Sequence, residues 1–114
     1  MNADRNPRAS QLRKGVLELA VLAMLRDGER YGSQLVDELS ERPGLSVSAG
    51  TIYPLLSRLR QGGMVTTTWH ESPVGPPRKH YALTASGHRA LDAMTETWAS
   101  LVRDMDAILR EDGR

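Results

Sequence analysis

A dense set of hydrogen-bonding groups lies in one short segment of the chain, between Ser48 and Gln61. The segment supplies hydroxyls, a phenol, an amide and guanidinium groups, and it contains no carboxylate. Such groups bind phosphate oxygens or the edges of bases. A merely solvated surface would more often be rich in Glu and Lys, so the segment predicts a surface that contacts nucleic acid. The candidate contact residues are Ser48, Gly50, Thr51, Tyr53, Pro54, Ser57, Arg58 and Gln61.

The apolar residues of the same segment predict a helix. They recur at i, i+3, i+4 and i+7, which places them together on one buried face. The Gly62-Gly63 pair that follows can adopt the positive φ that ends many helices. The polar residues then lie on the exposed face, opposite this stripe. The stripe consists of Ile52, Leu55, Leu56 and Leu59.

Pro54 is compatible with two alternative starts of this helix. If Thr51 is the N-cap, Pro54 lies in the first turn, where an N–H would have no partner. If Ser48 is the N-cap, one helical hydrogen bond is lost and the carbonyl of Gly50 is freed. We favour Ser48, a preferred cap residue. In that register Gly50 has no side chain to obstruct the close approach of a phosphate.

Further candidate contacts lie outside this helix. The segments 65–70 and 78–83 are rich in β-branched and aromatic residues, so they predict a hairpin with a projecting Pro- and Gly-rich loop. Arg78 and Lys79 follow the tip of that loop, where they can contact phosphate or enter a minor groove. Tyr31 begins an expected helix that ends at Glu41, and it suits either the edge of the core or a phosphate contact.

The remaining segments complete the order of elements. An almost wholly apolar helix is expected from Ser10 to Arg26, after a loose basic arm at residues 1–9. Residues 10–83 thus show the element order of a winged helix-turn-helix, which is helix, helix, turn, helix and hairpin. This fold places its third helix in the major groove. Thr84 is expected to cap a last helix from Ala85 to Arg110, within the segment 84–114. The predicted fold is mainly α with a small β-hairpin.

The last helix carries an apolar stripe with the spacing of a coiled-coil seam. The stripe is too short for a free-standing coiled coil, so it predicts a dimer contact supported by other surfaces. The alternative is packing against the chain's own small domain. Trp98 is either core of this seam or a stacking surface for a flat effector. The predicted dimer and effector residues are Leu91, Met94, Trp98, Leu101, Met105 and Ile108.

Charge and composition limit the possible functions. The net charge is +1, but residues 1–14 hold four basic residues against one acid, and residues 42–83 hold five against one. A polyanion would dock at these stretches. The chain has no cysteine, its three histidines lack ligand spacing, and no nucleophile–base pair is visible. We therefore expect no metal, no cofactor and no enzyme activity. No apolar run approaches the length of about 20 residues needed to span a bilayer, and no signal peptide is evident, which predicts a cytoplasmic protein.

The motifs described so far also resemble the PadR family of transcriptional regulators over nearly the whole chain. The resemblance rests on "LRKGVLELAVLAML", "YGSQLVDEL", "SAGTIYPLLSRLRQGGMV", "GPPRKHYALTASG" and the helix that carries Trp98. It implies a homodimeric winged-helix repressor of the smaller subfamily, in which the C-terminal helix makes the dimer and a phenolic or flat aromatic compound is the effector. The chain departs from the family pattern at Ser33, where an aromatic is common, and at Lys14, where Arg is commoner.

Two functions of different classes remain open. The first is a homodimeric repressor that binds a two-fold operator in double-stranded DNA and is released by a planar aromatic small molecule. The alternative is a winged-helix protein-interaction module that does not bind DNA. The acid-free segment between Gly50 and Gln61 and the basic hairpin favour the first.

Overall fold

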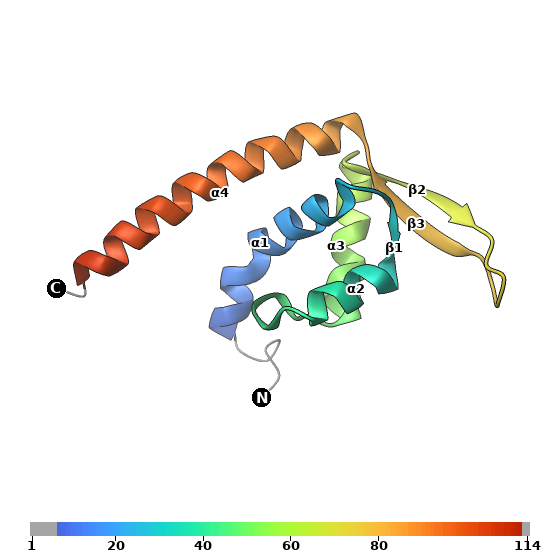
Figure 1. Cartoon of the computed structure of the whole chain (residues 1–114), viewed down its shortest axis with the longest axis horizontal. Helices are drawn as coiled ribbons and strands as arrows, with labels where there is room; N and C mark the ends of the chain where they lie inside the picture. The colour runs from blue at the N-terminus through green and yellow to red at the C-terminus, as the bar shows by residue number, and fades with distance from the viewer. Residues whose placement is uncertain (1–6, 113–114) are drawn as a thin grey trace.

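The computed structural model describes residues 7–112 and has the expected mainly helical architecture with a small sheet (Figure 1). The order of elements is that of a winged helix-turn-helix followed by a long C-terminal helix. The elements are α1 (Pro7–Leu25), β1 (Arg30–Tyr31), α2 (Gly32–Ser40), the short 3-10 helix η2 (Pro43–Leu45), α3 (Ala49–Gln61), β2 (Val65–His70), β3 (Arg78–Leu83) and α4 (Ala85–Asp112).

The sheet contains the predicted hairpin and one strand that the sequence did not reveal. Strands β2 and β3 pair antiparallel, from Val65 opposite Leu83 to His70 opposite Arg78. Strand β1 adds to the other side of β3, which gives the order β1-β3-β2. Tyr31 therefore lies in a strand, opposite His80, and is also the N-cap of α2, so the predicted helix begins within one residue of its expected start. Two residues are too few to show a strand period in the sequence.

The first helix begins earlier than predicted. Helix α1 starts at Pro7, so residues 7–9 are helical and do not belong to a loose arm. Proline is favoured in the first turn of a helix, because its fixed φ suits the helix and its missing N–H would have no partner there. The remainder of the expected arm, residues 1–6, lies outside the described residues.

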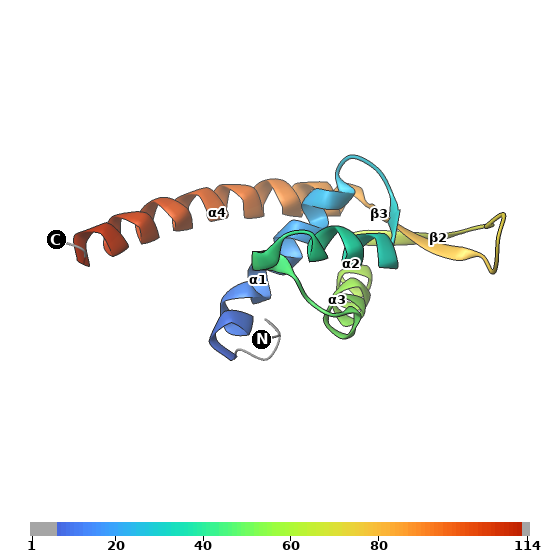
Figure 2. The same cartoon turned by 60° about the horizontal axis from the view of Figure 1, so that its bottom comes forward.

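A single apolar core joins the first three helices, the sheet and the start of α4. Helices α1, α2 and α3 enclose it, and α4 crosses above α1 (Figures 1 and 2). All four residues of the apolar stripe of α3, from Ile52 to Leu59, face this core, as their spacing predicted. The buried members are Leu17, Val21, Leu22, Leu25, Leu35, Leu39, Val47, Ile52, Leu55, Leu56, Leu59, Val65, Tyr81 and Leu91.

Leu91 is part of this core, and its assignment to the dimer seam was wrong. Its exposed fraction is only 3%, and Met94 also packs against the core from one side. The reason is that the first turns of α4 still cover α1 and β3 before the helix leaves the domain. The C-terminal half of α4 extends past the other elements (Figure 1), and Leu101 is 53% exposed.

The start of α4 is joined to the end of α3 through Thr84. The Thr84 hydroxyl donates to the carbonyl of Gly63 at 2.6 Å and accepts from the N–H of Gly87 at 3.0 Å, so the predicted cap is confirmed. The Thr84 N–H donates to the carbonyl of Met64 at 3.1 Å. Gly63 has a φ of 77°, the positive value expected after α3. These bonds fix the direction in which α4 leaves the domain.

Candidate nucleic-acid interface

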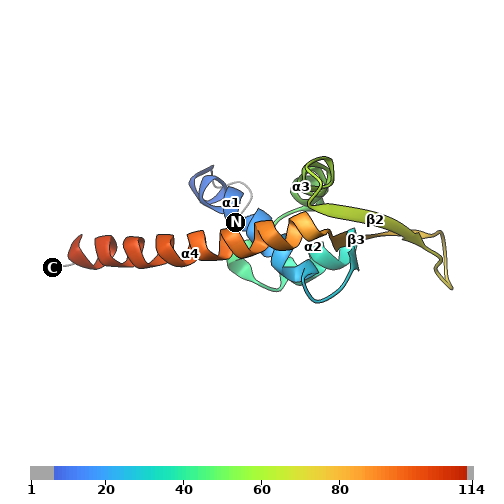
Figure 3. The ribbon, with the colours of Figure 1, turned by 90° about the horizontal axis from the view of Figure 1, so that it is seen from above.

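Helix α3 projects from one side of the domain, together with the first half of α1 (Figures 2 and 3). The apolar stripe of α3 is buried, while the candidate contact residues on the opposite face of the helix are exposed to solvent. The structure therefore brings the predicted contact residues of α3 onto one free surface. These exposed residues are Ser48, Gly50, Thr51, Tyr53, Pro54, Ser57, Arg58 and Gln61.

The start of α3 follows the register with Ser48 as N-cap. Ser48 has extended backbone angles, and its carbonyl accepts from the N–H groups of Thr51 and Ile52 at 3.0 and 3.2 Å. The Ser48 side chain itself makes no capping hydrogen bond. Pro54 lies inside the helix, so it offers no N–H to the carbonyl of Gly50. The alternative start at Thr51 was wrong.

One flank of α3 faces the wing, which is the β2–β3 hairpin. The Tyr53 ring packs directly on the N-terminus of α2, where a Cβ on Gly32 would lie 2.5 Å from Tyr53 Cε1. A hollow of about 360 Å³ opens between α2, α3 and the wing. Burial, and then the nearby Tyr53, raise the pKa of the Tyr81 phenol, while Arg60 opposes this shift. The lining residues are Tyr31, Gly32, Ser33, Tyr53, Trp69, Arg78, Lys79 and Tyr81.

The two cations of the wing lie over aromatic rings. The guanidinium carbon of Arg78 is 4.4 Å from the ring centroid of Tyr31. The ammonium of Lys79 is 5.7 Å from the centroid of Trp69 and 6.0 Å from that of Tyr81. These are the distances of cation–π contacts. Tyr31 is half-buried, and its ring lies beneath the Arg78 guanidinium, so the two residues occupy the same part of the candidate interface.

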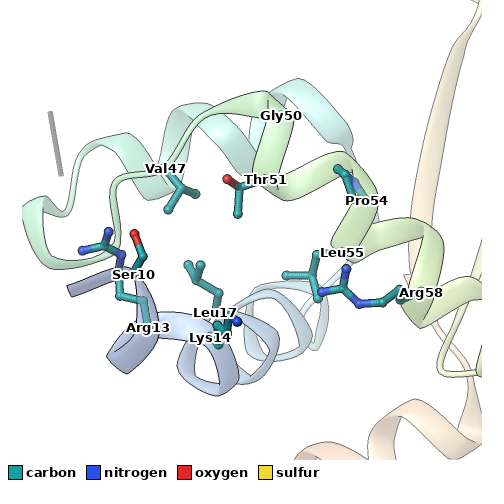
Figure 4. A pocket seen from close by; sticks show the side chains of 10 residues that line it. All are labelled: Ser10, Arg13, Lys14, Leu17, Val47, Gly50, Thr51, Pro54, Leu55 and Arg58. Atoms are coloured by element: carbon teal, nitrogen blue, oxygen red, sulfur yellow. The ribbon is translucent and has the colours of Figure 1, made fainter. Parts of the chain in front are cut away.

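The other flank of α3 faces α1 across a cleft of about 550 Å³ (Figure 4). The exposed face of α3 thus lies between the cleft beside α1 and the hollow beside the wing. Pro54 and Arg58 line the cleft, and Tyr53 lines the hollow. The contribution of α1 to this surface was missed from the sequence, where the charge excess of residues 1–14 was its only signal. The lining residues are Ser10, Arg13, Lys14, Leu17, Val47, Gly50, Thr51, Pro54, Leu55 and Arg58.

The histidines of the wing interact with one another rather than forming a ligand cluster. The rings of His70 and His80 lie 4.1 Å apart, and His70 Nε2 is 2.9 Å from a carboxylate oxygen of Glu29. His88 is exposed on α4. Within residues 7–112, no group of three or more potential ligands is arranged to hold a metal ion.

A second candidate site lies between α1 and the outer half of α4. It is an apolar cleft of about 440 Å³. Trp98, Leu101 and Met105 of the predicted seam line it together with Met94, whereas Ile108 lies beyond it. The wall from α1 was missed, because periodicity within one helix does not reveal which second helix it faces. That wall consists of Leu12, Gly15, Val16 and Leu19.

Over residues 7–112 the structure contains no helix long and apolar enough to span a membrane.

The fold and the exposed α3 surface define a winged helix-turn-helix protein. Residues 21–93, from the last turn of α1 into α4, match the family model described as the transcriptional regulator PadR-like family. The chain therefore belongs to the PadR family, as the sequence motifs predicted.

Individual relatives agree with this assignment. The chain is 32% identical to the transcriptional regulator Rv3488 of Mycobacterium tuberculosis, over 83% of this chain and 87% of the relative. The crystal structure of a PadR family transcriptional regulator from Eggerthella lenta is 33% identical and matches with a TM-score of 0.79, over 90% of this chain and 88% of the other. Bacillus subtilis PadR in complex with operator DNA is 32% identical with a TM-score of 0.65, over 70% of this chain and 46% of the other.

Proposed function

We propose that the protein is a homodimeric repressor that binds a two-fold operator in double-stranded DNA and acts in the cytoplasm. The observation that carries the proposal is the exposed face of α3, which has no acidic residue and is flanked by the cations of the wing. The similarity to Bacillus subtilis PadR, which was crystallised with operator DNA, supports the same partner for this chain.

In the proposed complex, helix and wing have different roles. Helix α3 enters the major groove, where the Arg58 guanidinium hydrogen-bonds a base edge and the hydroxyls of Thr51 and Ser57 add shorter contacts. Arg78 and Lys79 of the wing bind phosphates along one flank of that groove. The absence of a side chain on Gly50 lets the backbone approach the DNA closely at the start of α3.

The dimer contact is assigned to the outer half of α4 and the adjoining face of α1. This surface exposes several large apolar side chains, and a second copy of the chain would remove them from water. A dimer also presents two α3 helices to two half-sites about one DNA turn apart. The exposed apolar residues are Leu12, Trp98, Leu101, Val102, Met105, Ile108 and Leu109.

Titration of a two-fold operator, with half-sites about 10 bp apart or a multiple of that, tests the DNA-binding proposal. Arg58→Ala should weaken operator binding by roughly 1–3 kcal/mol, because a base contact is lost. Arg78→Ala and Lys79→Ala should instead lower affinity for all sequences alike and flatten the salt dependence. Fluorescence anisotropy at several salt concentrations measures both effects. Wild-type protein that binds no duplex at any salt concentration would favour the protein-interaction module.

We further propose that a planar aromatic molecule binds beside Trp98 and releases the operator. The apolar cleft of about 440 Å³ has the size of a small-molecule site. Its Met94 and Met105 walls are flexible and adapt to varied flat rings, which stack on the Trp98 indole. A ligand there would alter the angle between protomers and so lower DNA affinity, typically by about 1–3 kcal/mol.

Tryptophan fluorescence should therefore be quenched by a planar aromatic compound, in parallel with operator release. Trp69 is a second emitter, on strand β2 of the wing. Trp98→Ala should remove most of the quenching. Because Trp98 also belongs to the surface assigned to the dimer, light scattering and operator titration of the variant must show a dimer that still binds DNA. Unchanged quenching in that variant would place the ligand elsewhere, and the absence of quenching by any aromatic compound would reduce Trp98 to a packing residue.

A further inference from the structure

Helix α1 has two functionally different faces in its first half. Leu12, Val16 and Leu19 face the apolar cleft beside α4. The cleft beside α3 is instead lined by residues at i, i+3, i+4 and i+7, namely Ser10, Arg13, Lys14 and Leu17. Because such residues share one side of a helix, α1 presents an apolar side to α4 and a basic side to α3.

The basic side of α1 lies opposite Arg58. Figure 4 shows Lys14 and Arg58 entering the same cleft from the two helices, with Leu17 and Leu55 between them. The residues that line this cleft include the cations Arg13, Lys14 and Arg58 but no aspartate or glutamate. The cleft therefore concentrates positive charge, and an anion is its expected occupant.

The position of the cleft indicates which anion this is. A helix in the major groove is bordered on each flank by one phosphate backbone, and the groove is only about 12 Å wide. Tyr53 and the wing cations lie along one flank of α3, and the α1 cleft lies along the other. The first half of α1 also projects on the same side of the domain as α3 (Figure 2).

We propose that the first half of α1 is a second phosphate-contacting element, in which Lys14 and Arg13 bind the DNA backbone on the side of α3 away from the wing. The Ser10 and Thr51 hydroxyls are further donors on the two sides of this cleft. The proposal rests on the proposed DNA-binding function. It also gives a role to two of the four basic residues in the stretch 1–14, which neither the α3 face nor the wing uses.

The test is the salt dependence of Lys14→Gln, measured on the operator and on an unrelated duplex. Lys14 is exposed, so the substitution should leave the fold intact by circular dichroism. Each lost phosphate contact should reduce the slope of log K against log salt by about one, and hence by about two for a dimer. Affinity should fall by the same factor on both duplexes, because phosphates carry no sequence information.

Two variants provide controls. Lys14→Arg keeps the charge and should retain the wild-type slope. Arg26→Gln removes the same charge beyond the other end of α1, where Arg26 forms an exposed ion pair with Asp27, and should also leave the slope unchanged.

The outcomes separate this inference from the proposed function. A wild-type slope in Lys14→Gln, together with a reduced slope in Lys79→Ala, would overturn the role of α1 and leave DNA binding intact. A loss confined to the operator would also contradict a phosphate contact. Wild-type protein that binds neither duplex would overturn the DNA-binding function itself.

Discussion

Leu101→Glu should leave the protein monomeric at micromolar concentration and abolish its binding to a two-fold operator. Leu101 is half-exposed in the single chain and lies in the middle of the apolar surface assigned to the dimer. In a dimer the introduced carboxylate would be buried without a partner, which costs several kcal/mol. A loss of about 3 kcal/mol weakens the dimer by roughly a hundredfold. Light scattering and sedimentation measure the change.

The matched control is Ala107→Glu. Ala107 is also exposed in the outer half of α4, but it lies nine residues after Trp98, about two and a half turns, which places it on the side of the helix opposite the apolar surface. This variant should remain dimeric and bind the operator like the wild type. A stable dimer of Leu101→Glu, or a monomer of Ala107→Glu, would show that the two chains meet on another surface.

Gly87→Ala should destabilise the domain strongly. Gly87 is buried in the first turn of α4, and a Cβ there would overlap the carbonyl oxygen of Met64. Because that oxygen belongs to the backbone, no rotamer change relieves the contact. Overpacking of this kind costs typically 1–3 kcal/mol, and about 4 °C in Tm for each kcal/mol in a domain of this size. Thermal and urea unfolding measure the loss.

Gly50→Ala tests whether the effect belongs to the contact rather than to the loss of a glycine. A Cβ on Gly50 would lie 3.5 Å from the Ser48 hydroxyl oxygen, an ordinary contact. Alanine favours a helix over glycine, so this variant should be at least as stable as the wild type. It should nevertheless bind the operator more weakly, because the methyl group obstructs the backbone approach at the start of α3. Equal stability losses in the two variants would contradict the proposed clash at Gly87.

The elements that the sequence predicted well are those with a strong local signal. The stripe from Ile52 to Leu59 and the Gly62-Gly63 pair marked α3, and Thr84 marked the start of α4. Each of these signals depends on contacts within a few residues. Strand β1 has no such signal, because Arg30 and Tyr31 form a strand only by pairing with β3, about fifty positions later in the chain.

The candidate sites were predicted in part: α3 and the wing for the nucleic-acid interface, and α4 alone for the apolar cleft. The hydrogen-bonding groups of α3 and the apolar stripe of α4 were visible as patterns, but the walls that face them were not. Both missing walls come from α1, whose Lys14 faces α3 and whose Leu12 faces the α4 cleft. The assignment of Leu91 to the dimer seam was wrong for a related reason. The heptad spacing continues across the point where α4 leaves the domain, so periodicity does not distinguish the part of α4 that packs on the core from the exposed part.

The aromatic rings beneath the wing cations affect the entropy of binding. A free arginine or lysine side chain samples many rotamers, and ordering it on a ligand costs about 0.5–1.5 kcal/mol. Arg78 lies over Tyr31 and Lys79 near Trp69, so these cations have already lost part of that freedom when the domain folds. In the proposed complex the wing is therefore preorganised, and more of the attraction between its charges and the phosphates remains as affinity.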